Sequence, residues 1–190
     1  MLKLLTRSLF ALSCLIAAPT VAMAQRPEGT PFADISNVTI LPYDVEGRDT
    51  AAVRRAIDKA RPTDPNDGKR VDALSRYNFR WRWRSGAQGK CSTTLEDVVF
   101  TATVTAPRLI NGSPKVNERF DRFITSLYAH EDGHIRYAWD HRSDIAAAIN
   151  SATCATANEA ALAAVKTISE HDIAYDKATR HGATTVIPFD

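Results

Sequence analysis

One short motif in the sequence has residue types and spacing that could do chemistry, His130-Glu131-Asp132-Gly133-His134. On a helix, side chains four residues apart lie on one face, so His130 and His134 can offer imidazole nitrogens to a single point. Zinc binds such nitrogens at about 2.0–2.1 Å and keeps a position open for water when the protein supplies one more ligand. Glu131, about 100° around the helix from His130, lies where a carboxylate can take a proton from that water. The motif therefore predicts two metal ligands and a general base.

The motif lies within a pattern typical of an amphipathic helix. Large apolar and aromatic residues recur at alternating spacings of four and three, and both histidines fall on the same stripe. That stripe should face the core, where an imidazole without a partner is costly, so a metal bound to both histidines would satisfy them together. The alternative is two buried histidines satisfied by hydrogen bonds alone. The stripe consists of Val116, Phe120, Phe123, Leu127, His130, His134, Tyr137 and His141.

Residues 1–24 are typical of a secretory signal peptide. Lys3 and Arg7 give a positive start, residues 8–18 are mostly apolar, and residues 22–24 match an A-x-A cleavage site. The apolar run is too short to span a bilayer. We therefore expect a periplasmic or secreted protein with no stable membrane insertion after the signal is removed.

Removal of this segment leaves two cysteines, Cys91 and Cys154. An even number of cysteines in an exported protein favours a disulfide. We expect the two to pair and to stabilise the fold by about 3–4 kcal/mol, because the bond restrains the unfolded chain. Two buried free thiols are the alternative.

The mature chain, residues 25–190, is long enough for a single domain with a hydrophobic core. Without Lys3 and Arg7, 22 basic residues balance 22 acidic ones. A chain without net charge has no general electrostatic reason to bind nucleic acid or an acidic membrane surface. We therefore expect neither partner, and the oligomeric state stays open.

The chain around the motif alternates between short strands and helices. Alternating or β-branched runs predict three strands, the first at an edge because it contains Pro42, and the other two as an antiparallel hairpin. Capping residues, glycines and prolines delimit three helices, the second of which carries the motif. We expect an α+β fold in which a small, mainly antiparallel sheet packs against the motif helix and a C-terminal helix. The expected strands are 38–45, 77–84 and 95–105, and the expected helices are 50–60, 114–150 and 158–179.

One face of the strand at 77–84 carries Arg80, Arg82 and Arg84, and the other face carries aromatic rings. The arginines could line a groove for an anionic substrate, or they could form a solvated face opposite a buried aromatic one. The second interpretation is favoured, because arginine commonly covers apolar surface while its charge stays in water.

A third metal ligand must come from another part of the chain. His141 shares the stripe but lies about 10 Å along the helix axis from His134, too far to bind the same ion. A helix that follows the motif helix after a short break can return antiparallel to it, which brings its C-terminal part near the motif. The candidates in and after that helix are His171, Asp172, Asp176 and His181.

Two motifs carry a family resemblance, and their combination is more specific than either alone. They are His130-Glu131-x-Gly133-His134 and Tyr175-Asp176-x-x-Thr179-x-His181-Gly182. On these motifs, the chain from about 43 to 182 resembles a bacterial family of predicted secreted zinc-dependent proteases, catalogued as domain of unknown function 922. The resemblance implies a zincin-like fold, Zn²⁺ as cofactor and a peptide or protein substrate.

The resemblance points to the second motif for the third ligand. Within it we favour His181 as the ligand, with Asp176 hydrogen-bonded to one of the histidines to orient it. The reverse assignment, in which Asp176 binds the metal and His181 stabilises the transition state, stays open.

These residues predict hydrolysis of an amide, with a peptide bond as the expected target. Zinc would polarise the carbonyl and lower the pKa of water towards about 7, while Glu131 passes the water proton to the leaving amine. Tyr175 either donates to the developing oxyanion or is an ordinary packed tyrosine. One alternative is a zinc amidase acting on cell-wall peptides. The other is a non-enzymatic periplasmic binding module with a structural metal, which would need no base at Glu131.

Overall fold

A computed structural model describes residues 29–190, so the predicted signal peptide at 1–24 lies outside the described residues. The strands are β1 (Val38–Glu46), β2 (Leu74–Trp81), β3 (Arg84–Ser85), β4 (Cys91–Ser92) and β5 (Val98–Ile110). The helices are α1 (Thr50–Ala60), α2 (Pro114–Asp140), α3 (Arg142–Ser151) and α4 (Ala157–Thr179), with short 3-10 turns at Ala87–Gly89 and Leu95–Asp97. This mixture confirms the predicted α+β class.

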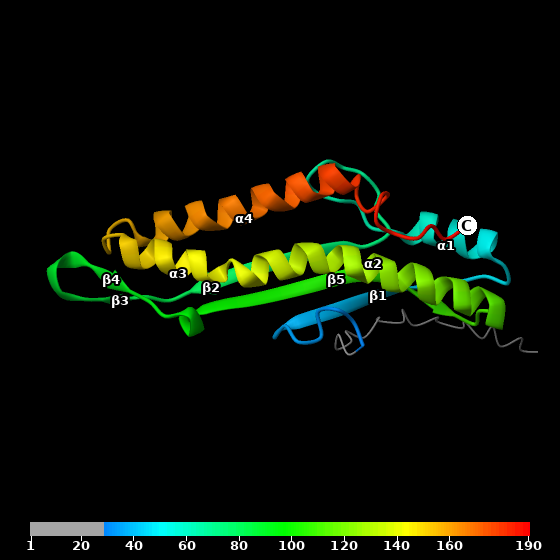
Figure 1. Cartoon of the computed structure of the whole chain (residues 1–190), viewed down its shortest axis with the longest axis horizontal. Helices are drawn as coiled ribbons and strands as arrows, with labels where there is room; N and C mark the ends of the chain where they lie inside the picture. The colour runs from blue at the N-terminus through cyan, green and yellow to red at the C-terminus, as the bar shows by residue number, and fades with distance from the viewer. Residues whose placement is uncertain (1–28) are drawn as a thin grey trace, which may run out of the picture.

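Strands β1, β5 and β2 form one sheet in that order (Figure 1). Strand β2 pairs antiparallel with β5, which confirms the predicted hairpin, and β3 and β4 form a separate antiparallel ribbon within the connection between them. Strand β1 lies at an edge, as its proline predicted, and pairs parallel with β5. Two of the three strand pairs are therefore antiparallel, and β1–β5 is the parallel one.

Strand β5 is longer than its sequence predicted, because Pro107 does not end it. Strand β2 begins at Leu74, which pairs with Thr105 of β5. The residues of β5 after Thr105 therefore have a neighbouring strand on one edge only. Pro107 pairs with Tyr43 of β1 in this one-sided stretch, where a missing N–H group is tolerated. The strand therefore continues to Ile110.

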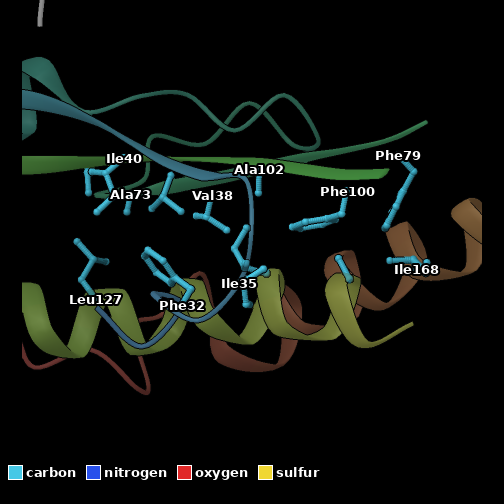
Figure 2. Packing of buried hydrophobic residues seen from close by; sticks show 14 of the residues in the cluster. Phe32, Ile35, Val38, Ile40, Ala73, Phe79, Phe100, Ala102, Leu127 and Ile168 are labelled. Carbon is cyan, nitrogen blue, oxygen red and sulfur yellow. The ribbon is translucent and has the colours of Figure 1, made fainter. Parts of the chain in front are cut away.

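The core lies between the sheet and α2 (Figure 2). The side chains of Phe79 and Phe100, cross-strand partners on β2 and β5, point from the sheet towards the helical layer. Phe100 in turn packs edge-on against Trp139 near the end of α2, with ring centroids 5.7 Å apart. Such packing fixes the face of α2 that is turned inward, and that face includes both motif histidines.

The helix predicted at 114–150 is two helices, because the chain breaks at His141. This residue has φ −86° and ψ 5°, outside helical geometry. Its backbone N–H donates to the carbonyl of Tyr137, and its ring Nδ1 also lies 2.9 Å from that oxygen. The ring thus helps to satisfy a carbonyl at the end of α2, and α3 starts in a new direction.

Helix α4 returns alongside α3 and α2, as predicted, so that its C-terminal part lies near the motif (Figure 1). A disulfide between Cys91 and Cys154 fixes the other end of α4, with the two Cα atoms 4.9 Å apart. The bond confirms the predicted pairing and is typical of proteins from an oxidising, exported environment. Within residues 29–190, no helix is both long and apolar enough to cross a membrane.

Candidate metal centre

The two motif histidines point towards one carboxylate of α4. His130 and His134 are buried on the inner face of α2, and Asp176 lies one turn before the end of α4. The Nε2 atoms of His130 and His134 lie 3.6 Å and 3.2 Å from Asp176 Oδ1. Three potential ligand atoms from two helices therefore converge on one point.

The separation of these atoms fits a bound metal ion. Tetrahedral ligands that each lie about 2.1 Å from a zinc ion are about 3.4 Å from one another, close to the two observed separations. His134 Nδ1 donates to Asp172 Oδ1 over 2.9 Å, and Thr185 Oγ1 lies 3.4 Å from His130 Nδ1. Because both Nδ1 atoms have partners, each Nε2 atom is oriented towards Asp176. The group His130, His134 and Asp176 could hold a metal ion.

The charges around the histidines also favour a cation. Burial disfavours a charged imidazole, but hydrogen bonds to the carboxylates of Asp172 and Asp176 raise the pKa of His134 to about 10. Burial likewise opposes ionisation of Asp176, but hydrogen bonds with His130 and His134 hold its pKa well below the usual range. Two carboxylates beside two imidazoles thus give a donor set with an excess of negative charge, which a divalent cation would neutralise.

Glu131 lies beside this group on the same turn of α2. Its side chain is buried, and its Oε2 atom accepts a hydrogen bond from Ser75 Oγ over 2.6 Å. Burial raises the pKa of Glu131 against the opposing attraction of His134. A carboxyl group with a raised pKa next to a metal site has the properties of a general base or acid.

Tyr175 packs against both histidines. Its ring is stacked on His130 with centroids 5.1 Å apart, and it meets His134 edge-on at 4.9 Å. A Cβ atom at Gly133 would lie 2.5 Å from this ring, so the glycine of the motif makes room for Tyr175. Tyr175 is not among the residues that line the neighbouring cavity, and its role as an oxyanion donor stays a prediction.

His181 belongs to a second group, with Asp64 and Asp67. Its Nε2 lies 2.9 Å from Asp67 Oδ2, and its Nδ1 lies 3.7 Å from Asp64 Oδ2 and 3.6 Å from Asp176 Oδ1. His181 has φ +53° and precedes Gly182, at φ +82°, whose backbone lies against the ring of His130. His181 is therefore next to the candidate ligands, while Asp176 is the residue placed between the two motif histidines.

The remaining sequence candidates lie away from this centre. His171 and His141 stack on the ring of Tyr137, and neither belongs to a candidate ligand group within residues 29–190. Arg82 and Arg84 are 81% and 70% exposed and pair with Asp97. Arg80 is also exposed, so the arginines are solvated as the sequence favoured, but they do not share one strand, because β2 ends at Trp81 and Arg84 begins β3.

A cavity of about 500 Å³ opens at the candidate centre. Glu131, His134 and Asp176 line one end of it. From there it follows α2 past Leu127 to Phe123, one and two turns towards the start of the helix. The volume is in the range of small-ligand sites.

Sequence reasoning missed two residues that support the centre. Ser75 on β2 donates a hydrogen bond to Glu131, and a single serine in the sequence gives no sign of such a contact. Asp172 had been only a ligand candidate, but it holds His134 Nδ1. The spacing of Asp172 and Asp176, four residues apart on α4, is the signal that could have shown both carboxylates on the face turned to the motif.

Comparison with known proteins gives a family but no activity. No curated protein and no solved structure matches the chain. A family model described as a bacterial protein of unknown function, DUF922, matches residues 40–182. The match includes the motif helix, α4, Asp176 and His181, and its description names no reaction and no metal. The chain belongs to the DUF922 family of bacterial proteins.

Proposed function

We propose that this protein is an exported zinc-dependent metallopeptidase that hydrolyses peptide bonds. The observation that carries the proposal is the convergence of two buried Nε2 atoms and one carboxylate beside Glu131, at the end of a cavity. A structural metal site has no use for a buried carboxylate next to it or for an open cavity, so the arrangement supports a hydrolase over a binding module. An arginine face along the cavity would have favoured the amidase alternative, but Arg80, Arg82 and Arg84 are not among the cavity's lining residues.

His130, His134 and Asp176 would hold the ion. A bound Zn²⁺ supplies a Lewis acid that polarises a carbonyl and makes water a nucleophile near neutral pH. Asp172 fixes the orientation of His134, and Thr185 contacts the ring of His130. Asp176 takes the position that the sequence had favoured for His181.

Glu131 would move the proton. Its carboxylate accepts a proton from the attacking water and delivers it to the leaving amine. Ser75 donates a hydrogen bond to Oε2, which leaves Oε1 free of that contact and holds the side chain at the cavity wall. Burial raises the pKa of Glu131, which brings it closer to the range useful for both steps.

The test is the zinc content of the purified mature protein and of single variants. We expect one zinc per chain in the wild type, loss of zinc in His134→Ala and Asp176→Ala, and retention of zinc in His181→Ala. Glu131→Ala should keep its zinc and lose hydrolysis of a peptide library, which separates the base from the ligands. A folded wild-type protein that binds no zinc when it is supplied would refute the proposal.

A further inference from the structure

The cavity ends away from the metal site at a group of arginines. We define this arginine end as Arg54, Arg61 and Arg70, which all line the cavity. Arg54 and Arg61 come from α1 and its C-cap, and Arg70 follows in the loop before β2. We propose that the arginine end binds a carboxylate of the substrate. The proposal rests on the proposed function, because it assigns a substrate class to the same cavity.

The arginines of α1 meet at a single acid. Arg54 binds both oxygens of Asp72 at 2.7 Å, and Arg61 Nη1 lies 3.3 Å from Asp72 Oδ1. Asp58 also contacts both arginines, but its side chain is 47% exposed, so water screens its charge. Two guanidinium groups thus share one shielded carboxylate.

The binding capacity of these side chains is only partly used. Arg70 donates through Nη2 to the backbone carbonyls of Lys59 and Arg61 at 3.0 Å and 2.7 Å, and it has no acidic partner among residues 29–190. The Nε atom of Arg61 is shielded from solvent and has no hydrogen-bond partner there. Asp190 also lines the cavity, but its carbonyl is bound by Arg119 of α2. A planar carboxylate suits the fork of donors that a guanidinium offers.

The distance between the two ends fits a peptide. Ser75 contacts Glu131, and Asp72, three residues earlier, contacts the arginines. Asp72 lies in a bend before β2, and three residues of chain span at most about 10–11 Å, so the arginine end lies within about three substrate residues of the base. The lining also includes apolar side chains, among them Phe123, Leu127 and Phe189. The cavity therefore fits a short peptide that has apolar residues and a carboxylate within about three residues of the scissile bond.

The experiment measures peptide binding separately from turnover. Zinc-loaded Glu131→Ala protein is titrated with N-acetylated hexapeptides of one apolar sequence in four forms. The forms carry a glutamate side chain with an amidated end, a glutamine with a free C-terminal carboxylate, a glutamine with an amidated end, or a lysine with an amidated end. We expect at least one carboxylate form to bind about tenfold more tightly than the neutral form. The first two forms show whether the carboxylate comes from a side chain or from a chain end.

The preference should depend on the arginine end. Arg70→Gln and Arg61→Gln, each in the Glu131→Ala protein, should lose it while zinc content and thermal unfolding stay unchanged. The matched control is Arg55→Gln, since Arg55 is exposed on the same helix and is not a cavity residue. Equal binding of all four peptides, or a preference that survives both variants, would overturn the proposal. If the preference is found but wild-type protein cleaves none of the peptides, the carboxylate site stands and the peptidase assignment fails.

Discussion

At the scale of single residues, Gly133 is the clearest case of a position where the surrounding structure leaves no room for a side chain. A glycine inside a helix costs about 1 kcal/mol relative to alanine, because it loses more backbone freedom on folding. Here that cost is offset by the ring of Tyr175, which fills the space of the missing Cβ and stacks on His130. Gly133 therefore affects the packing of His130 indirectly, because it makes room for the ring of Tyr175.

Gly133→Ala should lower the free energy of unfolding, although alanine is the better helix former. Forcing a methyl group against the Tyr175 ring costs about 1–3 kcal/mol, which exceeds the gain in helix propensity. Urea unfolding of the zinc-free protein measures the change. In a Tyr175→Ala background the same substitution should be neutral or stabilising, and an equal effect in both backgrounds would show that the ring is not responsible.

Asp172 offers a second prediction at this scale. The carboxylate accepts the Nδ1–H of His134, and loss of such an orienting group typically lowers metal affinity by about 10–100-fold. Asp172→Asn should therefore weaken zinc binding without abolishing it, measured by competition with a chromophoric chelator. Glu170→Gln, an exposed neighbour on α4, is the control and should bind zinc like the wild type. Unchanged affinity in Asp172→Asn would exclude the orienting role.

At the scale of elements, the sequence predicted most of the helices and strands but not how they meet. Periodicity placed α1, α4 and the β2–β5 hairpin, because each is encoded by neighbouring residues. The passage of β5 through Pro107 depends on pairing with β1, which no local pattern contains, whereas the break at His141 involves Tyr137 only four residues earlier and carries no glycine or proline to signal it. The same distinction between local and long-range contacts applies to the residues of the candidate metal centre. His130, Glu131 and His134 share one helical turn and were predicted together, whereas Asp176, Ser75 and Asp172 reach the site only through packing between elements.

The parallel pairing of β1 and β5 places Asp44 directly opposite Arg108, and this pair should make stability depend on pH. The guanidinium of Arg108 donates to both oxygens of Asp44 and lowers the pKa of that carboxyl group. The pKa of Asp44 is therefore lower in the folded protein than in the unfolded chain, where it is about 3.9. The pair stabilises the fold fully at pH values above this unfolded pKa. That stabilisation is lost as the pH falls through the pKa of Asp44 in the folded protein.

Asp44→Asn should therefore lower the free energy of unfolding by about 0.5 kcal/mol near pH 7, a small effect because both side chains are partly exposed. Chemical denaturation of wild type and variant in parallel, at neutral pH and at about pH 2.5, measures the difference. The two proteins should converge in acid. Asp121→Asn, at an exposed position on α2, is the control. A difference that persists in acid would mean that the effect is not electrostatic.

At the scale of the whole molecule, α4 has a specific attachment near each of its two ends in addition to its packing against α3. Cys154 lies three residues before the helix and is bonded to Cys91, and Asp176 lies near its end at the candidate metal centre. Between them the helix is about 34 Å long, and it leaves Leu162 and Ile173 more than half exposed. The middle of α4 nevertheless contributes Ile168 to the core and packs against α3.

Hydrogen exchange along α4 should report the two attachments separately. Reduction of the disulfide should increase exchange in the first turns of α4, and chelation of zinc should increase it in the last turns, with each change confined to its own end. With both treatments we expect exchange to increase at both ends of α4, while the turn around the buried Ile168 and the β5 strand stay protected because their packing is unaffected. The double variant Cys91→Ser/Cys154→Ser, measured with zinc, reproduces the first condition without a reductant. If chelation deprotects both ends equally, the two attachments are not independent.

These two attachments depend on two different properties of the surroundings. The attachment through Cys154 requires oxidised thiols, and the attachment through Asp176 requires a divalent metal ion. A compartment that provides only one of them would leave α4 loose at one end and Asp176 or the β3–β4 ribbon without its partner. The chain would therefore have both ends of α4 fixed only in a compartment that is oxidising and also supplies a divalent metal ion.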